Sequence, residues 1–382
     1  MNKLKTVLRE TPQAQHIKKI YNKVCRLYSL RYRNCRLEKD SKEAIKFLNS
    51  VHPCPKNANV PMIMKKERML DLSIIIPAHN VEKYVNQCVD SILDQKVEYN
   101  YEVIIIENAS SDKTMDALGK YATNSKVKIL RSERPDPSAA RNIGLRESKG
   151  RYIMFVDSDD YLVPGILEQM MHGILDYSAD IAVCGFEKLE GGAFYKYPAV
   201  EKETVWTETR DMMRIYGFAW GKIYKWELFD NVCFPEDLWY EDTIIHMEIF
   251  PRAKKMIVLP ALGLVYRRNP GSITACHEKT VRCLDTLWVM QAILQKRHES
   301  GLKCDSVIYE ELLKHFTEVS WIRIRRQSQE IKEAFFCAAA YCMERERRCI
   351  ENNSLSPELK KLDNIFREKK EKLWESYCKY NG

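Results

Sequence analysis

The chain has 382 residues, of which 45% are hydrophobic and 30% charged, with 14 glycines and 14 prolines. This composition excludes a disordered or fibrous chain, and the length suffices for one large α/β domain and a smaller second region. The formal net charge is +8, and residues 1–40 hold all of the excess, with eleven Lys and Arg against three acidic residues. A basic arm on a neutral body indicates a local anionic partner such as a phospholipid surface, or merely a solvated helix face, rather than a nucleic-acid-binding fold.

Cysteine usage indicates a reducing compartment. The thirteen cysteines lie scattered between Cys25 and Cys378, their number is odd, and no pair has the Cys-x-x-Cys spacing of a zinc or redox site. The sequence shows neither a signal peptide nor a run of the roughly 20 apolar residues that span a bilayer. We therefore expect a cytoplasmic protein, with peripheral contact to the inner face of the membrane as an option for residues 1–40.

The two ends of the chain have helical patterns. Between Ile17 and Tyr28, apolar residues recur at helical spacing with basic residues between them, which predicts a basic amphipathic helix. This helix can lie on an anionic membrane or pack against the main domain, and both alternatives stay open. Three prolines within 51–64 indicate a linker, and apolar stripes predict helices beyond Ala275. The predicted division is a basic helical arm with linker at 1–70, a main domain at 71–274 and a C-terminal helical region at 275–382.

The main domain begins with a continuous β-branched run, Leu72–Ile76, closed by Pro77. Such a run is typical of a strand buried on both faces of a parallel sheet. Strand patterns alternate with helical patterns further along, which predicts a doubly wound, mostly parallel α/β sheet whose ligands bind beyond the carboxyl ends of the strands. The further strands are predicted at 101–106, 127–130, 152–156 and 181–184, and the helices at 81–95, 112–122 and 164–177.

Polar and acidic residues follow three of these strands, at 77–82, 107–112 and 157–160. Three carboxylates within 157–160 repel one another unless a cation or paired bases neutralise them. Alternation along an extended segment places Asp157 and Asp159 on one side, where their oxygens can hold Mg²⁺ or Mn²⁺. For an isolated acidic triplet, a solvated turn that caps the next helix is the favoured explanation.

Five segments together carry a specific resemblance: SIIIPAHN at 73–80, EVIIIENASSD at 102–112, SAARNIGL at 138–145, GRYI at 150–153 and FVDSDD at 155–160. In this order and spacing they resemble the inverting glycosyltransferase family 2. The resemblance implies the GT-A type of α/β fold, a nucleotide-sugar donor and a divalent metal. It implies a donor site at Pro77, His79, Asn80, Glu82, Glu107, Asn108, Arg141, Asp157, Ser158 and Asp159, with the metal at Asp159 and Asp157. Glu107-Asn108 departs from the two aspartates usual in the family. The resemblance therefore identifies the nucleotide, expected to be UDP, less securely than it identifies the fold.

Further along, Glu241 and Asp242 precede apolar residues at helical spacing and resemble the acceptor-side motif of the family. The resemblance implies that Asp242 is the general base, taking the proton of an acceptor hydroxyl that attacks the anomeric carbon opposite the leaving diphosphate. Residues 266–274 resemble the closing segment of the family, in which Arg268 reaches the diphosphate or the acceptor. The expected activity is sugar transfer to a glycan or lipid-linked acceptor in cell-surface polysaccharide or lipopolysaccharide synthesis.

Other protein classes fit less well. A non-catalytic nucleotide-sugar-binding scaffold of a polysaccharide-assembly complex has no need to keep mutually repelling acids. A glycoside hydrolase also uses two carboxylates, but here the acids follow parallel strands. A dinucleotide oxidoreductase requires a Gly-x-Gly-x-x-Gly segment after the first strand, and the sequence has none there. Residues 1–40 show no nucleic-acid recognition motif, so no nucleic-acid partner is expected.

Overall fold

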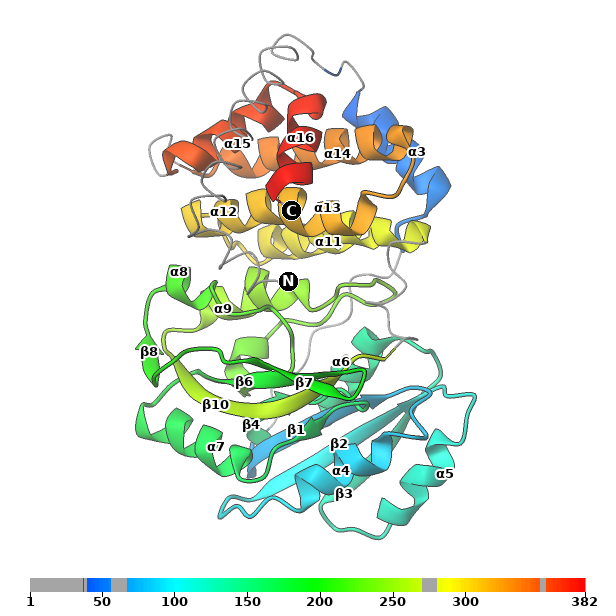
Figure 1. Ribbon diagram of the computed structural model, residues 1–382, viewed down its shortest axis with the longest axis vertical. Helices are drawn as coiled ribbons and strands as arrows, with labels where there is room; N and C mark the ends of the chain where they lie inside the picture. Colours follow the sequence, from blue (N-terminus) through cyan, green and yellow to red (C-terminus); the bar gives the residue numbers. More distant parts are fainter. Residues whose placement is uncertain (1–36, 38–39, 56–66, 270–279, 351–354, 382) are drawn as a thin grey trace. The chain divides into compact units, whose positions relative to one another are not determined.

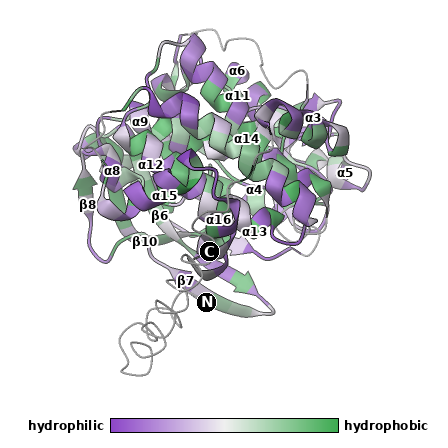
Figure 2. Ribbon diagram, turned by 90° about the horizontal axis from the view of Figure 1, so that it is seen from above, coloured by the Kyte–Doolittle hydropathy of each residue, from purple (hydrophilic) through white to green (hydrophobic). Residues whose placement is uncertain are grey.

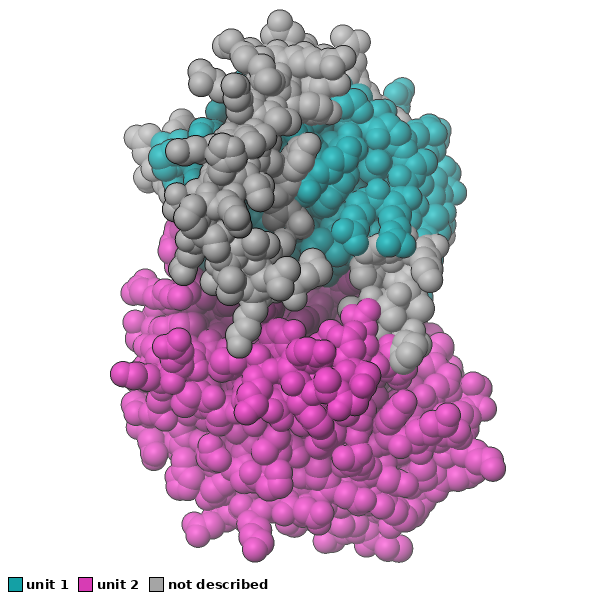
Figure 3. Space-filling view, viewed as in Figure 1, with its two compact units in different colours: residues 1–53, 278–287, 304–382 teal, residues 54–277, 288–303 magenta. Residues whose placement is uncertain are grey.

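The computed structural model describes residues 37, 40–55, 67–269, 280–350 and 355–381 (Figure 1). The predicted helix at 17–28 and the end of the closing segment, 271–274, lie outside these residues. The chain divides into two compact units, which Figure 3 colours separately. The sheet unit comprises 54–277 and 288–303, and the helical unit comprises 1–53, 278–287 and 304–382.

One mixed sheet of ten strands forms the sheet unit within the described residues, in the order β3-β2-β1-β4-β9-β6-β10-β5, with β7 beside β6 and β8 beside β10. The strands β3, β2, β1 and β4 are parallel, whereas β9 runs antiparallel to both of its neighbours. The predicted doubly wound parallel sheet is therefore confirmed for the first half of the unit, and the second half is mixed. The strands are β1 Leu70–Ala78, β2 Tyr101–Asn108, β3 Val127–Ser132, β4 Gly150–Phe155, β5 Tyr161–Leu162, β6 Ile181–Glu190, β7 Ala193–Tyr197, β8 Thr204–Trp206, β9 Lys222–Lys225 and β10 Met256–Arg267.

The centre of the sheet is fully apolar, since Ile74 to Ile76 and Val103 to Ile106 have no exposed surface. Helices flank it, and the three that the sequence predicts are confirmed (Figure 1). A further helix, α6, packs so closely on β1 that a Cβ atom at Gly144 would lie 2.3 Å from Ile75 Cγ2. Only glycine permits this approach, which matters because α6 carries Arg141. The helices of this unit are α4 Val85–Leu93, α5 Thr114–Leu118, α6 Pro137–Glu147, α7 Ile166–Asp176, α8 Thr209–Met212 and α9 Phe250–Arg252.

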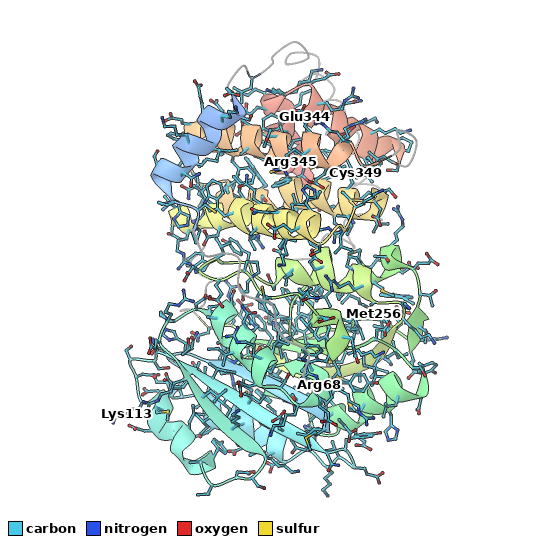
Figure 4. All side chains as sticks on the ribbon, turned by 180° about the vertical axis from the view of Figure 1, so that it is seen from behind. Arg68, Lys113, Met256, Glu344, Arg345 and Cys349 are labelled. Carbon is cyan, nitrogen blue, oxygen red and sulfur yellow. The ribbon has the colours of Figure 1, made fainter. Side chains whose placement is uncertain are left out.

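Arg68, which Figure 4 labels, anchors the residues that precede β1. Its guanidinium carbon lies 3.5 Å from the centroid of the Trp226 ring, and Nη1 donates to the Ser148 carbonyl at 2.5 Å. The Trp226 indole also donates to the Ser148 hydroxyl at 3.2 Å. These contacts join the start of β1 to the turn between α6 and β4, and so hold the two strands whose ends carry the polar segments.

The helical unit has its own aromatic core. The Trp374 indole donates to the Phe316 carbonyl at 2.8 Å, and its ring contacts Phe335 and Phe336. Green and purple residues alternate along the helices in Figure 2, as expected for helices with one buried face. None of the described helices combines the length and apolar character that a membrane crossing requires. The helices are α3 Ser41–Val51, α11 Asp285–Glu299 (in this unit up to Leu287), α12 Ser306–Lys314, α13 Ser320–Ile324, α14 Gln329–Arg347, α15 Pro357–Arg367 and α16 Glu371–Asn381.

Candidate active site

The acidic turn after β4 is the electrostatic centre of the candidate site. It is closed by a hydrogen bond from the Asp160 N–H to the Asp157 carbonyl at 3.0 Å, and Ser158 is buried within it. Burial and the neighbouring Asp157 carboxylate raise the pKa of Asp159 to about 6. Burial and the carboxylates of Asp159 and Asp157 raise the pKa of Asp160 well above its usual range. The turn therefore concentrates negative charge that the protein does not fully neutralise.

Arg267, at the end of β10, holds this turn in place. Its backbone N–H donates to Asp160 Oδ1 at 2.8 Å, and Nη1 donates to the Asp159 carbonyl at 2.5 Å. The guanidinium also lies over the rings of Tyr161, 4.6 Å from the centroid, and Tyr84, at 5.3 Å. Arg267 lies within the segment 266–274 that resembles the closing segment of the family, but Arg268 is the residue predicted there to bind. Arg268 instead pairs through Nε with Glu190 Oε1 at 3.5 Å on the surface.

Arg141 connects the acidic turn to the predicted acceptor motif. Nη2 donates to Asp157 Oδ1 at 3.0 Å, and Nη1 donates to Glu241 Oε1. Burial by itself lowers the pKa of Arg141, but the Glu241 and Asp157 carboxylates outweigh it and raise the pKa above its usual range. Glu241 is itself buried, and burial raises the pKa of its carboxyl. One buried cation thus joins carboxylates that lie 84 positions apart in the sequence.

The segment before Glu241 is bound to the middle of α6 and to the loop that precedes this helix. Asn142 Nδ2 donates to the Phe234 carbonyl at 2.9 Å, and Asn142 Oδ1 accepts from the Phe234 N–H at 2.8 Å. Arg134 adds ion pairs with Glu236 at 2.5 Å and with Asp237 at 2.8 Å.

Backbone strain marks the same segment. Tyr240, directly before Glu241, has a φ of 67°, a left-handed conformation that is strained for a bulky side chain. The strain lies next to the acid pair, where the contacts to α6 hold the backbone.

Asp242 is half-buried and begins the turn that leads into a π-helical segment, Ile245–Ile249, where the sequence predicts a helix. Its carboxylate acts on two residues of β9. Burial and, after it, the Asp242 carboxylate raise the pKa of Tyr224. At Lys222, burial lowers the pKa, and the Asp242 carboxylate partly opposes this effect. Lys222 is 3% exposed, and burial lowers its pKa to about 7. This buried amine beside the predicted base was also missed in the sequence, where no pattern distinguishes it from a surface lysine.

The ends of β1 and β2 are joined by a network of polar side chains. His79 Nδ1 lies 2.8 Å from the Asn108 carbonyl, and Asn80 Oδ1 accepts from the Ser111 N–H at 2.8 Å. Glu82 receives a hydrogen bond from the Lys113 N–H at 3.0 Å. Asn80, with a φ of 52°, takes the left-handed conformation that asparagine tolerates.

Glu107 and Asn108 differ in how their side chains are used. Glu107 Oε1 accepts from the Ser110 N–H at 2.6 Å and so stabilises its own loop. Asn108 is 2% exposed, and its Oδ1 has no hydrogen-bond partner within the described part of the chain. A buried amide oxygen without a partner is costly, which makes Asn108 the stronger candidate of the two for a ligand contact. Pro77 is half-buried in β1, opposite Ile106.

The acidic turn fits a divalent cation bound together with a substrate. Asp157 and Asp159 carry carboxylate oxygens of the kind that such a cation prefers, and the fully buried Asp160 Oδ2 has no hydrogen-bond partner among the residues that the structure describes. No group of three or more His, Cys, Asp or Glu side chains with metal-site geometry occurs among them. Mg²⁺ commonly binds through one or two carboxylates plus substrate phosphates, which suits a site with two protein ligands.

Comparisons with known proteins agree with this geometry. Residues 73–226 match the family model described as Glycosyl transferase family 2. The uncharacterized glycosyltransferase EpsJ of Bacillus subtilis is 30% identical over 244 residues, which cover 60% of this chain and 68% of that protein. The poly(ribitol-phosphate) beta-N-acetylglucosaminyltransferase TarS of Staphylococcus aureus is 27% identical over 65% of this chain, which spans only 45% of the length of TarS.

Solved structures show the same fold. The crystal structure of S. aureus TarS 1–349 in complex with UDP-GlcNAc matches with a TM-score of 0.62 and 20% identity, covering 81% of this chain and 91% of that one. The mixed sheet with its flanking helices has the GT-A type of fold. On the sequence match, the chain belongs to glycosyltransferase family 2.

Proposed function

We propose that this protein transfers a sugar from a UDP-sugar to a hydroxyl group of a glycan acceptor, with inversion at the anomeric carbon, in the synthesis of a cell-surface polysaccharide. The observation that carries the proposal is the bridge from Asp157 through Arg141 to Glu241. It supports the proposal because one buried cation joins the predicted donor-side turn to the predicted acceptor-side motif. UDP is supported by the S. aureus TarS structures, which are described as complexes with UDP and UDP-GlcNAc.

The donor would lie across the ends of β1, β2 and β4. Asn108, with its unpartnered oxygen, would contact the nucleotide, and the linked loops at His79 and Asn80 would shape its pocket. Mn²⁺ or Mg²⁺ at Asp157 and Asp159 would supply positive charge against the diphosphate. Arg141 and Arg267 hold the carboxylates and the backbone of the turn in position.

The acceptor would lie beside Asp242. The oxygen of its hydroxyl attacks the anomeric carbon from the side opposite the diphosphate, the bond to the diphosphate breaks, and the proton passes to the Asp242 carboxylate. A single displacement of this kind inverts the configuration and requires no covalent intermediate with the protein. The Asp242 carboxylate raises the pKa of both Arg141 and Lys222, so it lies within electrostatic range of these two side chains.

Calorimetric titration with a panel of UDP-, GDP- and dTDP-sugars, with and without Mn²⁺, tests the proposal. We expect one UDP-sugar to bind, more tightly with Mn²⁺ than without it. Asp159→Ala should remove the effect of Mn²⁺, and Asp176→Ala, an acidic residue at the end of α7, serves as the control. Unchanged donor affinity in Asp159→Ala would refute the metal assignment, and binding of a GDP-sugar alone would refute the assignment of UDP.

The second candidate function is a nucleotide-sugar-binding scaffold without catalysis. The departure at Glu107-Asn108 favours it, because the family usually has two aspartates there. Release of UDP from a bound UDP-sugar in the presence of acceptor extracts excludes it, whereas donor binding with no turnover under any condition supports it. Membrane docking through residues 1–40 stays a separate prediction, which fails if a chain lacking these residues binds anionic vesicles as well as the full chain does.

A further inference from the structure

Six aromatic side chains beside the candidate site form one continuous array of ring contacts. We call them the aromatic array; they come from β6, β7, β10 and the segment that leads into β9. At its centre, Trp220 stacks on Phe218 with ring centroids 4.7 Å apart, and on Tyr266 at 5.6 Å. Further contacts join Phe186 edge-on to Trp220 at 5.0 Å and stack it on Tyr197 at 4.9 Å. The members are Phe186, Tyr197, Tyr216, Phe218, Trp220 and Tyr266.

The array runs from a buried end to an exposed end. Trp220 is 8% exposed, whereas Tyr216, stacked on Phe218 at 5.5 Å, is 51% exposed. These three residues alternate along the chain as Tyr-x-Phe-x-Trp, and in an extended segment alternate side chains point to one side. The other side is occupied, because a Cβ atom at Gly217 would lie 3.2 Å from the His246 ring. The segment is therefore held so that its aromatic side chains face together.

The β6–β7 hairpin extends the exposed end. Tyr197 lies opposite Phe186 in the antiparallel pair, and Tyr195 lies opposite Lys188 two positions along. Since alternate residues of a strand share a face, the 51% exposed Tyr195 lies on the face of the array. Phe194, 52% exposed, lies on the opposite face of the same strand.

The buried end of the array is joined to the acidic turn. Trp220 pairs through its backbone with Phe155, two residues before Asp157. Tyr266 directly precedes Arg267, whose guanidinium donates to the Asp159 carbonyl. Two strands that carry the array, or pair with it, therefore also carry the acidic turn and the arginine that holds it, and this connection is the basis for assigning the array to the acceptor side.

The polar rim of the array distinguishes between two kinds of ligand. On the same face of the hairpin, Lys188 pairs with Glu190 at 2.5 Å, and Glu190 also pairs with Arg268 at 3.5 Å. The charges are therefore paired, whereas an anionic membrane is bound by an excess of unpaired basic residues. Aromatic faces carry negative charge density and tyrosine adds a hydroxyl group, so the surface suits a ligand with apolar C–H faces and many hydroxyl groups.

We propose that the aromatic array is an extended acceptor subsite that binds pyranose rings of a glycan chain beyond the sugar that is modified. The proposal rests on the proposed function, because it assigns the occupant of the acceptor side of the same site. It makes a glycan of several sugars a better acceptor than a monosaccharide, since the added rings contact Tyr216 and Tyr195.

Binding of oligosaccharides of one to six units, from the chito-, cello- and malto- series, tests this inference. Calorimetry and saturation-transfer NMR are carried out on the full chain with saturating UDP and Mn²⁺. We expect affinity to rise with length in at least one series. Tyr216→Ala and Tyr195→Ala should each weaken binding of the long oligosaccharide by roughly 2- to 10-fold, the range that single aromatic contacts supply, and should leave the monosaccharide unaffected.

Phe194→Ala is the matched control, because it removes an equally exposed ring from the opposite face of the same strand. It should not change the affinity for any oligosaccharide, and Tyr216→Phe should retain most of the gain with length. Normal UDP binding with no gain with length in the wild-type protein, or an equal loss in Phe194→Ala, would overturn the subsite. Absent UDP binding would instead count against the proposed function, so the two failures are distinguishable.

Discussion

Replacing Lys222 by methionine tests how strongly the buried site disfavours charge. The Lys222 ammonium donates to the Phe218 carbonyl at 2.8 Å and the Trp220 carbonyl at 3.3 Å. Burial lowers its pKa from 10.5 to about 7, although Cys184 and Asp242 act in the opposite direction. Between these two values the unfolded chain binds the proton and the native protein does not, so stability rises with pH across this window. A shift of this size corresponds to on the order of 4–5 kcal/mol.

Lys222→Met removes this penalty but also removes the Lys222 donor from the Trp220 carbonyl and leaves the Phe218 carbonyl only the Tyr224 hydroxyl at 3.5 Å, which costs about 1–3 kcal/mol. The variant should therefore equal or exceed the wild-type protein in free energy of unfolding at pH 6, and should be less stable at pH 10. Urea unfolding followed by tryptophan fluorescence at both pH values measures the difference. Lys225→Met, in the same strand but half-exposed, is the control and should show no such reversal. A difference between Lys222→Met and wild type that stays constant from pH 6 to pH 10 would refute the reasoning.

Three further predictions concern the candidate site. Asp242→Asn should lower turnover roughly 100-fold or more while donor affinity is retained, as measured by single-turnover UDP release and calorimetry; normal turnover would remove Asp242 as the base. Arg141→Met leaves Asp157 and Glu241 without their shared cation and should destabilise the protein by about 3–5 kcal/mol in urea unfolding, with Arg141→Lys less affected. Gly144→Val should displace α6 from β1, lowering the free energy of unfolding by about 1–3 kcal/mol and weakening donor binding; an unchanged donor affinity would show that the position of α6 is not required.

The parallel half of the sheet was predictable because its strands are continuous apolar runs. Leu72–Ile76 can be buried on both faces only in a parallel sheet covered by helices, and the structure confirms this arrangement. In the mixed half, the beginning of β6 was predicted, at 181–184, but its antiparallel neighbours were not. The strand β9 has four residues, and β10 contains Pro260 and Gly263, which interrupt the usual strand pattern. The helix α6 was missed because small and polar residues such as Ser138 and Asn142 form its buried face.

The acidic turn was found in the sequence, but the arginine that holds it was not. Arg267 and Arg268 are neighbours, and a strand directs neighbouring side chains to opposite faces. Which of them faces the turn depends on the register of β10 against β6, and that register shifts twice, between Val258 and Leu262 and between Leu262 and Leu264. A shift of one residue exchanges the faces. The sequence does not reveal these shifts, so the choice between the two arginines required the structure.

The charges of the site also bear on the order of binding. Five carboxyl groups, two arginines and one buried amine with a lowered pKa surround it in the described part of the chain: Asp157, Asp159, Asp160, Glu241 and Asp242, with Arg141, Arg267 and Lys222. A nucleoside diphosphate adds negative charge to a site that already has a surplus; burial and, after it, the Asp157 carboxylate raise the pKa of Asp159. A divalent cation reduces both the repulsion among the carboxylates and the repulsion between the carboxylates and the diphosphate. We therefore expect the cation and the donor to strengthen each other's binding. Because such coupling is reciprocal, the factor by which Mn²⁺ raises donor affinity should equal the factor by which the donor raises Mn²⁺ affinity.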